Sequence, residues 1–360
     1  MDSVDSKETE LKVFCCTNCG AELKYKAGTA LLICSYCDTK NEIPVEETLV
    51  EELDFNSYVK RLEAESLEPE KVIQCRSCGA TAAVAENLKS LYCSYCSTPL
   101  VEEDIHEQRY IQPSHLLPFA IDNQKVHDLF SKWIDGLWFA PTNLKKAALS
   151  PIGLSGVYVP YWTYDMHLSS DYIGKRGEDY TVTVRRADKD VEERKTNWRT
   201  TSGKVLLFFD DVLVSASGNI DAASLSKLGP WDLNELVKTN DQYLTGFVTE
   251  KYQIKLMAGF EAAKKYTKSR IESAIRSDIG GDRQIVDAYE TNYYDIQFKH
   301  ILLPVYVSTY QYKDKRYNFY VNGKNGKLIG KRPYSAMKII IRILWFFAIL
   351  AILCLLAMLV

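Results

Sequence analysis

The feature that most constrains this chain is a repeat of cysteine pairs. The tetrapeptide Cys-Ser-Tyr-Cys begins at Cys34 and again 59 residues later at Cys93. A Cys-x-x-Cys-Gly motif precedes each copy by the same interval. Two such pairs, a hairpin's length of chain apart, are typical of a four-thiolate zinc site. The sequence therefore predicts two zinc sites, held by Cys16, Cys19, Cys34, Cys37, Cys75, Cys78, Cys93 and Cys96.

Both zinc ions are expected to be structural. Four thiolates complete a tetrahedron and leave no position for a reactive water. A module of about 30 residues is too small to fold on its core alone and usually needs a disulfide or a metal ion. Zinc binding contributes about 10–16 kcal/mol of folding free energy in zinc-finger peptides. Two disulfides per module are the alternative, but the chain begins without a secretory signal, which favours the reducing cytosol and metal binding. Cys15 falls outside the repeat and is interpreted as a spare thiol.

An uncharged apolar stretch at the C-terminus predicts a membrane span. The 18 residues from Ile343 to Val360 carry no charge, and as a helix they measure about 27 Å, close to the roughly 30 Å hydrocarbon core. We expect a transmembrane tail anchor over 339–360, a buried core helix being the alternative. Cationic flanks stay cytoplasmic, which predicts a single-pass cell-membrane protein with a cytoplasmic body and with 324–342 against anionic lipid. The cations of that stretch are Lys324, Lys327, Lys331, Arg332, Lys338 and Arg342.

The order of these segments predicts an α+β chain. We expect two small β zinc ribbons, then a duplicated α+β domain, then a single C-terminal transmembrane helix. The expected segments are a disordered tail at 1–12, zinc ribbon 1 at 13–44, an acidic helical connector at 45–70, zinc ribbon 2 at 71–103, and α+β lobes at 110–240 and 241–335.

Each expected lobe combines a helix with strands. In the first, Asp122 is predicted to cap a helix whose apolar stripe runs to Trp138, and a turn region is expected between strands at 156–168 and 179–186. In the second, a long helix ends at Gly280-Gly281 and three antiparallel strands follow over 300–330.

The sequence contains no recognisable catalytic motif. A Walker A loop, a complete zincin motif and a Gly-x-Ser-x-Gly elbow are all absent from the 360 residues. Asp165 with His167, and the pair Asp210-Asp211, resemble acid/base groups, but solvated loop or strand-edge positions are the better interpretation. We therefore predict that the protein is not an enzyme.

Several stretches resemble a bacterial family of membrane-associated zinc-ribbon proteins. They include "LLPFAID", "KWIDGLWFAP", "VYVPYWTYD", "YLTGFVTEKY" and the strands from His300 onward, together with the paired cysteines. The family is described as having a TFIIB-type zinc ribbon and is often labelled a primosomal replication-restart helicase. Some relatives are linked to the phage-shock protein A envelope-stress system and an SPFH-like scaffold. The resemblance implies the same eight ligands, and the helicase's nucleotide site has no counterpart here.

Charge favours a protein partner. Residues 1–110, which contain both ribbons, carry 21 acidic and 11 basic side chains, a net charge of −10. The whole chain is −3, so residues 111–360 carry +7. Because nucleic-acid affinity comes largely from neutralising phosphates, an acidic N-terminal part favours protein recognition. The leading hypothesis is a tail-anchored cytoplasmic adaptor at the inner membrane face, with a role in envelope stress. The alternative is a nucleic-acid-binding, replication-linked factor.

Overall fold

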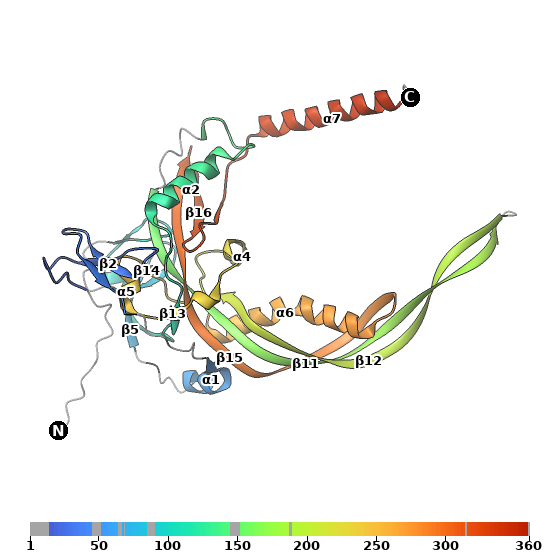
Figure 1. Cartoon of the computed structure of the whole chain (residues 1–360), viewed down its shortest axis with the longest axis horizontal. Helices are drawn as coiled ribbons and strands as arrows, with labels where there is room; N and C mark the ends of the chain where they lie inside the picture. The colour runs from blue at the N-terminus through green and yellow to red at the C-terminus, as the bar shows by residue number, and fades with distance from the viewer. Residues whose placement is uncertain are drawn as a thin grey trace.

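The computed structural model describes residues 14–44, 52–63, 67, 69–84, 91–144, 152–186, 189–313 and 315–358. The expected disordered tail at 1–12 lies outside these residues, as does much of the expected connector at 45–70. Figure 1 shows the described chain as a body from which a curved β-sheet arm extends, with a separate helix at the C-terminal end.

Three long strands form the main sheet. They are β11 (Ile152–Arg186), β12 (Lys189–Ser215) and β15 (Arg283–Tyr312). β11 lies between the other two and pairs with both in antiparallel orientation. Because β15 begins opposite Gly177, β11 and β12 continue beyond it as a two-stranded hairpin. These strands make up the arm of Figure 1.

Short strands complete this sheet, which has nine strands within the described residues. Both expected lobes contribute to it, so the chain is α+β as predicted but a duplicated domain is not confirmed. The three antiparallel strands expected over 300–330 are confirmed as β15, β16 and β17. The short members are β4 (Leu53–Asp54), β10 (His115–Leu116), β13 (Val237–Lys238), β14 (Val248–Thr249), β16 (Lys315–Asn322) and β17 (Leu328–Gly330).

The turn expected after residue 168 is wrong, because β11 continues through that segment. Its glycines serve close packing instead. A Cβ atom at Gly174 would lie 2.5 Å from the Ile285 carbonyl oxygen, and one at Gly177 would lie 2.7 Å from the Thr196 methyl carbon. Glycine inside a strand is expected where another part of the chain approaches closely.

Two predicted helix boundaries are confirmed. The Asp122 carboxylate accepts a hydrogen bond from the Lys125 backbone N–H at 2.9 Å and caps α2. Gly280, at φ +66°, ends α6. The expected extension of the first helix to Trp138 is wrong, because α2 ends at Asp135. The helices are α1 (Phe55–Glu63), α2 (Asn123–Asp135), α4 (Ala222–Leu228), α5 (Asp241–Leu244), α6 (Leu256–Ile279) and α7 (Ala336–Met358), with 3₁₀ turns η1 (Glu102–Asp104) and η2 (Leu233–Glu235).

Helix α6 lies along the inner side of the curved arm (Figure 1). Its buried residues Ala263, Ile271 and Ile275 share one face and pack in a common core with Trp162 and Tyr164 of β11. At Gly259 of α6 a Cβ atom would lie 2.7 Å from Trp162 Cδ1. The absence of a side chain there lets the helix lie directly on the aromatic rings of the sheet.

Helix α7 leaves the body and packs against little of it (Figure 1). Its segment Ala336–Cys354 has 19 residues and a mean hydropathy of 2.4, and none of that stretch is buried. The helix is therefore long and apolar enough to span a membrane. The sequence predicted this helix from residue 339, three residues after its observed start.

Small antiparallel sheets carry the cysteine repeat. The strands of ribbon 1 are β1 (Leu23–Tyr25), β2 (Leu31–Cys34) and β3 (Lys40–Glu42). Those of ribbon 2 and its continuation are β5 (Pro69–Gln74), β6 (Thr81–Ala83), β7 (Leu91–Tyr92), β8 (Pro99–Leu100) and β9 (Ile105–Arg109).

Candidate metal centres

Four cysteines converge in ribbon 1. The Sγ atoms of Cys16 and Cys37 lie 3.6 Å apart, and those of Cys19 and Cys34 lie 3.4 Å apart. All four sulfurs lie within 4.8 Å of one another. A tetrahedral zinc with Zn–S bonds of about 2.3 Å places its sulfurs about 3.8 Å apart. The cluster therefore has a size that suits one zinc ion.

Ribbon 2 repeats this arrangement. The Sγ atoms of Cys75 and Cys96 lie 3.5 Å apart, as do those of Cys78 and Cys93, and this cluster too lies within 4.8 Å. The structure thus brings together all eight cysteines that the sequence singled out, in two sets of four. Cys15 lies beside the first cluster but is exposed and is not one of its four thiols.

The backbone explains why each cysteine pair points its thiols inward. In ribbon 1 the N–H of Gly20 donates to the Cys16 carbonyl at 2.8 Å, and that of Asp38 donates to the Cys34 carbonyl at 3.0 Å. The chain turns at these two residues with φ of +73° and +55°. Gly79 and Ser97 do the same in ribbon 2, at φ +76° and +60°. The turn glycines were expected, whereas the left-handed aspartate and serine were not.

A threonine accompanies the last cysteine of each ribbon. Thr39 Oγ1 lies 3.0 Å from Cys37 Sγ, and Thr98 Oγ1 lies 3.2 Å from Cys96 Sγ. Hydrogen bonds from the Thr39 side chain and backbone lower the pKa of Cys37 to about 6. Burial alone would raise the pKa of Cys96, but hydrogen bonds with Thr98, Cys75 and Cys78 together outweigh it and lower that pKa to about 6. Both contacts favour the thiolate form that binds metal.

Ribbon 1 is docked onto the body through Tyr25 of β1. Its hydroxyl donates to the Phe119 carbonyl at 3.1 Å, and its ring meets the Tyr243 ring edge-on with 5.2 Å between centroids. The Gly28 N–H also donates to the Phe119 carbonyl, at 2.8 Å. A Cβ atom at Gly28 would lie 2.8 Å from the Ala120 carbonyl oxygen, so this contact requires glycine.

Ribbon 2 is docked through Tyr95, inside its second Cys-x-x-Cys. The Tyr95 hydroxyl donates to Glu250 Oε2 at 2.5 Å. The other oxygen of Glu250 accepts from Ser217 at 2.7 Å and from Asn219 at 2.6 Å. Burial raises the pKa of Glu250 to about 7, and these donors partly oppose the shift. A buried ion pair between Lys251 and Glu70, at 2.5 Å, adds a second contact.

The equivalent residue of ribbon 1 faces solvent. Tyr36 occupies the position of Tyr95 in the repeat, yet its side chain is 83 % exposed. It lies at the tip of the second cysteine turn, next to the exposed Ser35 and Asp38. The two ribbons therefore share the geometry of their four cysteines and differ in what their aromatic residue contacts.

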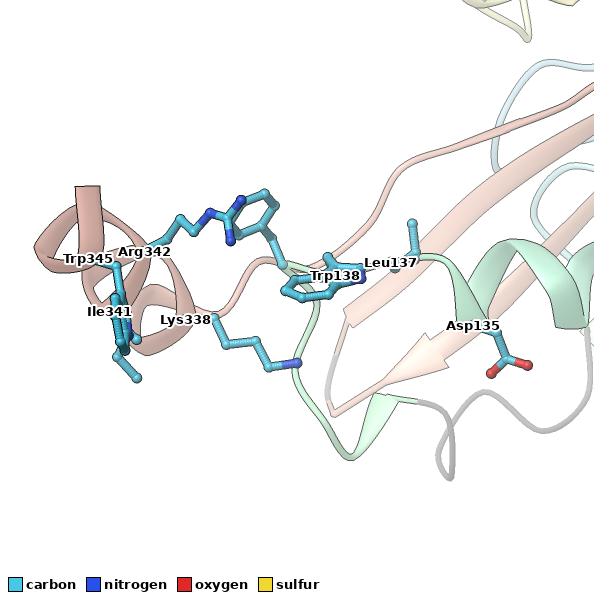
Figure 2. Close-up of a pocket in the computed structure, with 8 residues that line it drawn as sticks. Asp135, Leu137, Trp138, Lys338, Ile341, Arg342 and Trp345 are labelled. Atoms are coloured by element: carbon cyan, nitrogen blue, oxygen red, sulfur yellow. The ribbon is translucent and has the colours of Figure 1, made fainter. Parts of the chain in front are cut away.

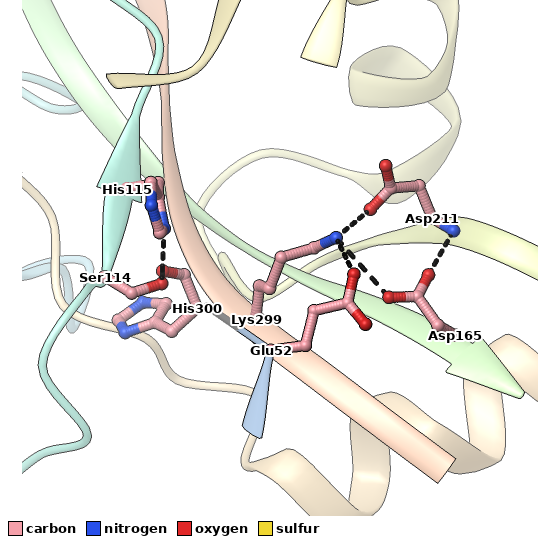
Figure 3. Close-up of polar contacts among 7 residues, drawn as sticks. All are labelled: Glu52, Ser114, His115, Asp165, Asp211, Lys299 and His300. Carbon is pink, nitrogen blue, oxygen red and sulfur yellow. Dashed lines mark hydrogen bonds and ion pairs between the residues drawn. The ribbon is translucent and has the colours of Figure 1, made fainter. Parts of the chain in front are cut away.

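Figure 3 shows an ion cluster around the buried Lys299 of β15, next to β11 and β12. The Lys299 ammonium lies 3.1 Å from Glu52, 3.4 Å from Asp165 and 2.7 Å from Asp211. The interpretation of Asp165 as solvated is wrong, because only 4% of it is exposed. Burial raises the pKa of Asp165. Burial opposes protonation of Lys299, but the carboxylates around it raise its pKa above the ordinary value.

This cluster has an architectural role in the sheet. The register of β11 shifts next to Asp165 against both neighbouring strands. Asp211 and Asp295 adopt positive φ there, at +49° and +48°. Such bulges bend a strand, and the Lys299 ammonium supplies the cation among the carboxylates. His167 is exposed on β11 and lies 4.6 Å from Phe208 between ring centroids, apart from this network.

No protein-family model and no solved structure matches the chain. The chain is 26% identical over 334 residues to a Bacillus subtilis (strain 168) protein that carries the name "Uncharacterized protein YdjG". The match covers 90% of this chain and 91% of that protein. The chain is therefore similar to this relative over nearly its full length.

Proposed function

We propose that this protein is a membrane-anchored zinc-ribbon adaptor that binds a protein partner through ribbon 1. The observation that carries the proposal is the exposed Tyr36 on a turn that zinc would hold rigid. A large aromatic side chain presented on a fixed backbone is a common anchor of protein interfaces. Its counterpart Tyr95 contacts Glu250 of the body, so both ribbons are docked but only ribbon 1 leaves the tyrosine of its second cysteine turn free to contact a partner.

The charge distribution supports a protein partner over nucleic acid. Residues 14–44 carry three acidic and three basic side chains, whereas 45–70 carry nine acidic and two basic ones. The acidic excess of the N-terminal part thus belongs mainly to the connector and not to the ribbons. Four thiolates around a divalent zinc still give each ribbon two further negative charges. A ribbon of this charge lacks the basic surface that phosphate binding needs.

The proposed anchor is α7, with the body on the cytoplasmic side. Lys324 pairs with Glu235, and Lys327 donates to the Gly229 carbonyl at 2.5 Å, so both cations are engaged within the body. Lys331, Arg332, Lys338 and Arg342 remain closest to the start of α7 and carry the cationic signal. A phage-shock protein A or SPFH-type scaffold at the membrane is the first partner to test.

Site-specific crosslinking tests the proposed partner surface. A photo-crosslinking amino acid replaces Tyr36 in the full chain, in intact cells, and the matched control places it at Tyr92, which is 65% exposed in ribbon 2. We expect a protein adduct from position 36 and none from position 92, and we expect Cys19→Ser to abolish it. Equal adducts from both positions would contradict the proposal.

A DNA-binding measurement on the same protein distinguishes the adaptor from a nucleic-acid-binding factor. Non-specific binding has a Kd of about 10⁻⁴–10⁻⁶ M at physiological salt, and we expect nothing tighter. Submicromolar binding that Tyr36→Ala abolishes would replace the adaptor by the nucleic-acid alternative.

Truncation tests the anchor. A chain that ends at residue 335 should leave the membrane fraction and remain folded, since the α7 side chains that the structure describes contribute nothing to the buried core clusters. Aggregation of this truncated chain would mean that α7 belongs to the core of the protein.

A further inference from the structure

The loop that follows α2 is attached to the first turn of α7. This loop, Leu137–Ala140, receives a hydrogen bond from the Ser335 N–H to the Phe139 carbonyl at 2.8 Å. The Lys338 ammonium donates to the Ala140 carbonyl at 2.7 Å. These bonds keep the loop beside the start of the apolar helix, although its Trp138 is 76% exposed (Figure 2).

Loop and helix together border an open hollow of about 470 Å³. Two cations line it, Lys338 and Arg342, and the Arg342 guanidinium carbon lies 5.9 Å from the centre of the Trp138 ring. Ile341 and Trp345 add apolar surface on the helix side, and Asp135 of α2 lies at the side of the body (Figure 2). The hollow thus combines two cations and one carboxylate with aromatic rings and aliphatic surface.

The hollow lies where the headgroups would be if α7 crosses a bilayer. Lys338 and Arg342 belong to the first two turns of α7, and an α-helix rises about 1.5 Å per residue. Both cations therefore fall within about 10 Å of the start of the helix. Tryptophan is enriched at this level of a membrane because its ring is apolar and its N–H is polar. Trp138 reaches the same level from the body, and Trp345 reaches it from the helix.

We propose that the Leu137–Ala140 loop is a second membrane contact and that the hollow binds the phosphate headgroup of an anionic phospholipid. The proposal rests on α7 spanning the membrane. A guanidinium binds phosphate through two parallel hydrogen bonds, Lys338 adds a second positive charge, and Ile341 contacts the first carbons of an acyl chain. A phospholipid offers all of these groups, whereas free phosphate leaves the apolar lining exposed to water.

Tryptophan quenching by brominated lipid tests the two contacts separately. The full chain is placed in nanodiscs of phosphatidylcholine and phosphatidylglycerol, with bromine near the headgroup end of one lipid at a time. We expect Trp138→Phe to lose part of the quenching and Trp345→Phe to lose another part. Unchanged quenching in Trp138→Phe would overturn the loop contact. If neither variant changes the quenching, α7 is not in the bilayer, and the anchor proposal is what fails.

The choice of brominated lipid tests the headgroup site. Quenching of Trp138 should be stronger with brominated phosphatidylglycerol than with brominated phosphatidylcholine. Arg342→Gln should reduce that preference about five-fold, the equivalent of about 1 kcal/mol per cation near a membrane. Lys331→Gln, a cation outside the hollow, is the matched control and should preserve it. Equal quenching by the two lipids would overturn the headgroup site, and so would loss of the preference on adding inorganic phosphate, which would identify a site for the free ion.

Discussion

Tyr36 and Tyr95 occupy the same position in two copies of one tetrapeptide, but only Tyr95 is held by the body, through its hydrogen bond to Glu250 at 2.5 Å. The difference lies in the partner and not in the turn, because both cysteine turns have the same backbone hydrogen bonds. A duplicated cysteine module thus presents a tyrosine on the same backbone turn twice, and the surroundings of each copy determine what that tyrosine contacts.

Removing one hydroxyl should reveal this difference. Tyr95→Phe leaves a buried oxygen of Glu250 without its donor, which costs about 1–3 kcal/mol. We expect urea unfolding of the zinc-loaded protein to show a loss of that size. Tyr36→Phe removes an exposed hydroxyl and should change the free energy of unfolding by less than about 0.5 kcal/mol. Equal effects of the two changes would contradict the docking role of Tyr95.

The metal content should be two zinc ions per chain. Cys75→Ser removes one of four ligands in ribbon 2, so elemental analysis of protein purified under reducing conditions should return one zinc. Cys15→Ser is the matched control, because Cys15 is an exposed thiol outside both clusters, and it should retain two. A loss of zinc in Cys15→Ser would show that this thiol takes part in coordination.

Lys299 should be essential for the stability of the bent sheet. Lys299→Met leaves Asp165 buried without its cation, and breaking a buried ion pair in this way costs about 3–5 kcal/mol. Lys204→Met breaks a pair with Asp171 at 3.2 Å in which both side chains are 56% exposed, and it should cost no more than about 1 kcal/mol. Thermal unfolding compares the two. A small loss in Lys299→Met would mean that the carboxylates take up protons instead.

Buried His300 should make the fold sensitive to acid. Its Nδ1 lies 2.7 Å from the Ile111 carbonyl oxygen, which requires the N–H on that nitrogen. Burial lowers the pKa of His300 from 6.5 to about 3. Between pH 6.5 and about 3, His300 is therefore protonated in the unfolded chain but neutral in the folded one. The free energy of unfolding consequently falls as the pH drops from 6.5 towards 3.

A substitution isolates this contribution from that of other groups. His300→Gln cannot titrate, so the difference in unfolding free energy between wild type and variant should be constant above pH 7. Below pH 6.5 it should shift in favour of the variant by up to about 1.4 kcal/mol per pH unit. A difference that stays constant down to pH 4 would show that His300 is protonated in the folded state.

The local features of this fold were predictable, and the long-range ones were not. The cysteine spacing, the Asp122 cap and the Gly280 stop act within a few residues, so the sequence indicates them directly. In the sequence, Gly174 indicates a turn. Its actual role depends on the close approach of Ile285, which lies more than a hundred residues later in the chain. The same limit applies to Lys299, since its carboxylate partners come from three distant segments.

The site was predictable to the same extent. The two sets of four cysteines follow from the spacing, because each Cys-x-x-Cys turn is a local structure. The difference between Tyr36 and Tyr95 depends on the contact of Tyr95 with Glu250, a residue 155 positions away that no local pattern pairs with it. Trp138 continues an apolar stripe in the sequence, yet the helix ends before it and its environment is set by α7.

The length of β11 also determines when the protein can finish folding. β11 and β12 can pair as soon as both are synthesised. The other edge of β11 stays unpaired until β15 is made, because each of its partners in β15 lies 106 to 157 residues later in the chain. Ninety-seven residues separate Ser215 from Tyr312, which a ribosome adds in roughly 5 to 20 s. For that time a nascent chain exposes a long open strand edge, the kind of surface that other strands join. The last residue of β15 comes only 24 residues before α7 begins, so the sheet and the apolar helix are completed almost together.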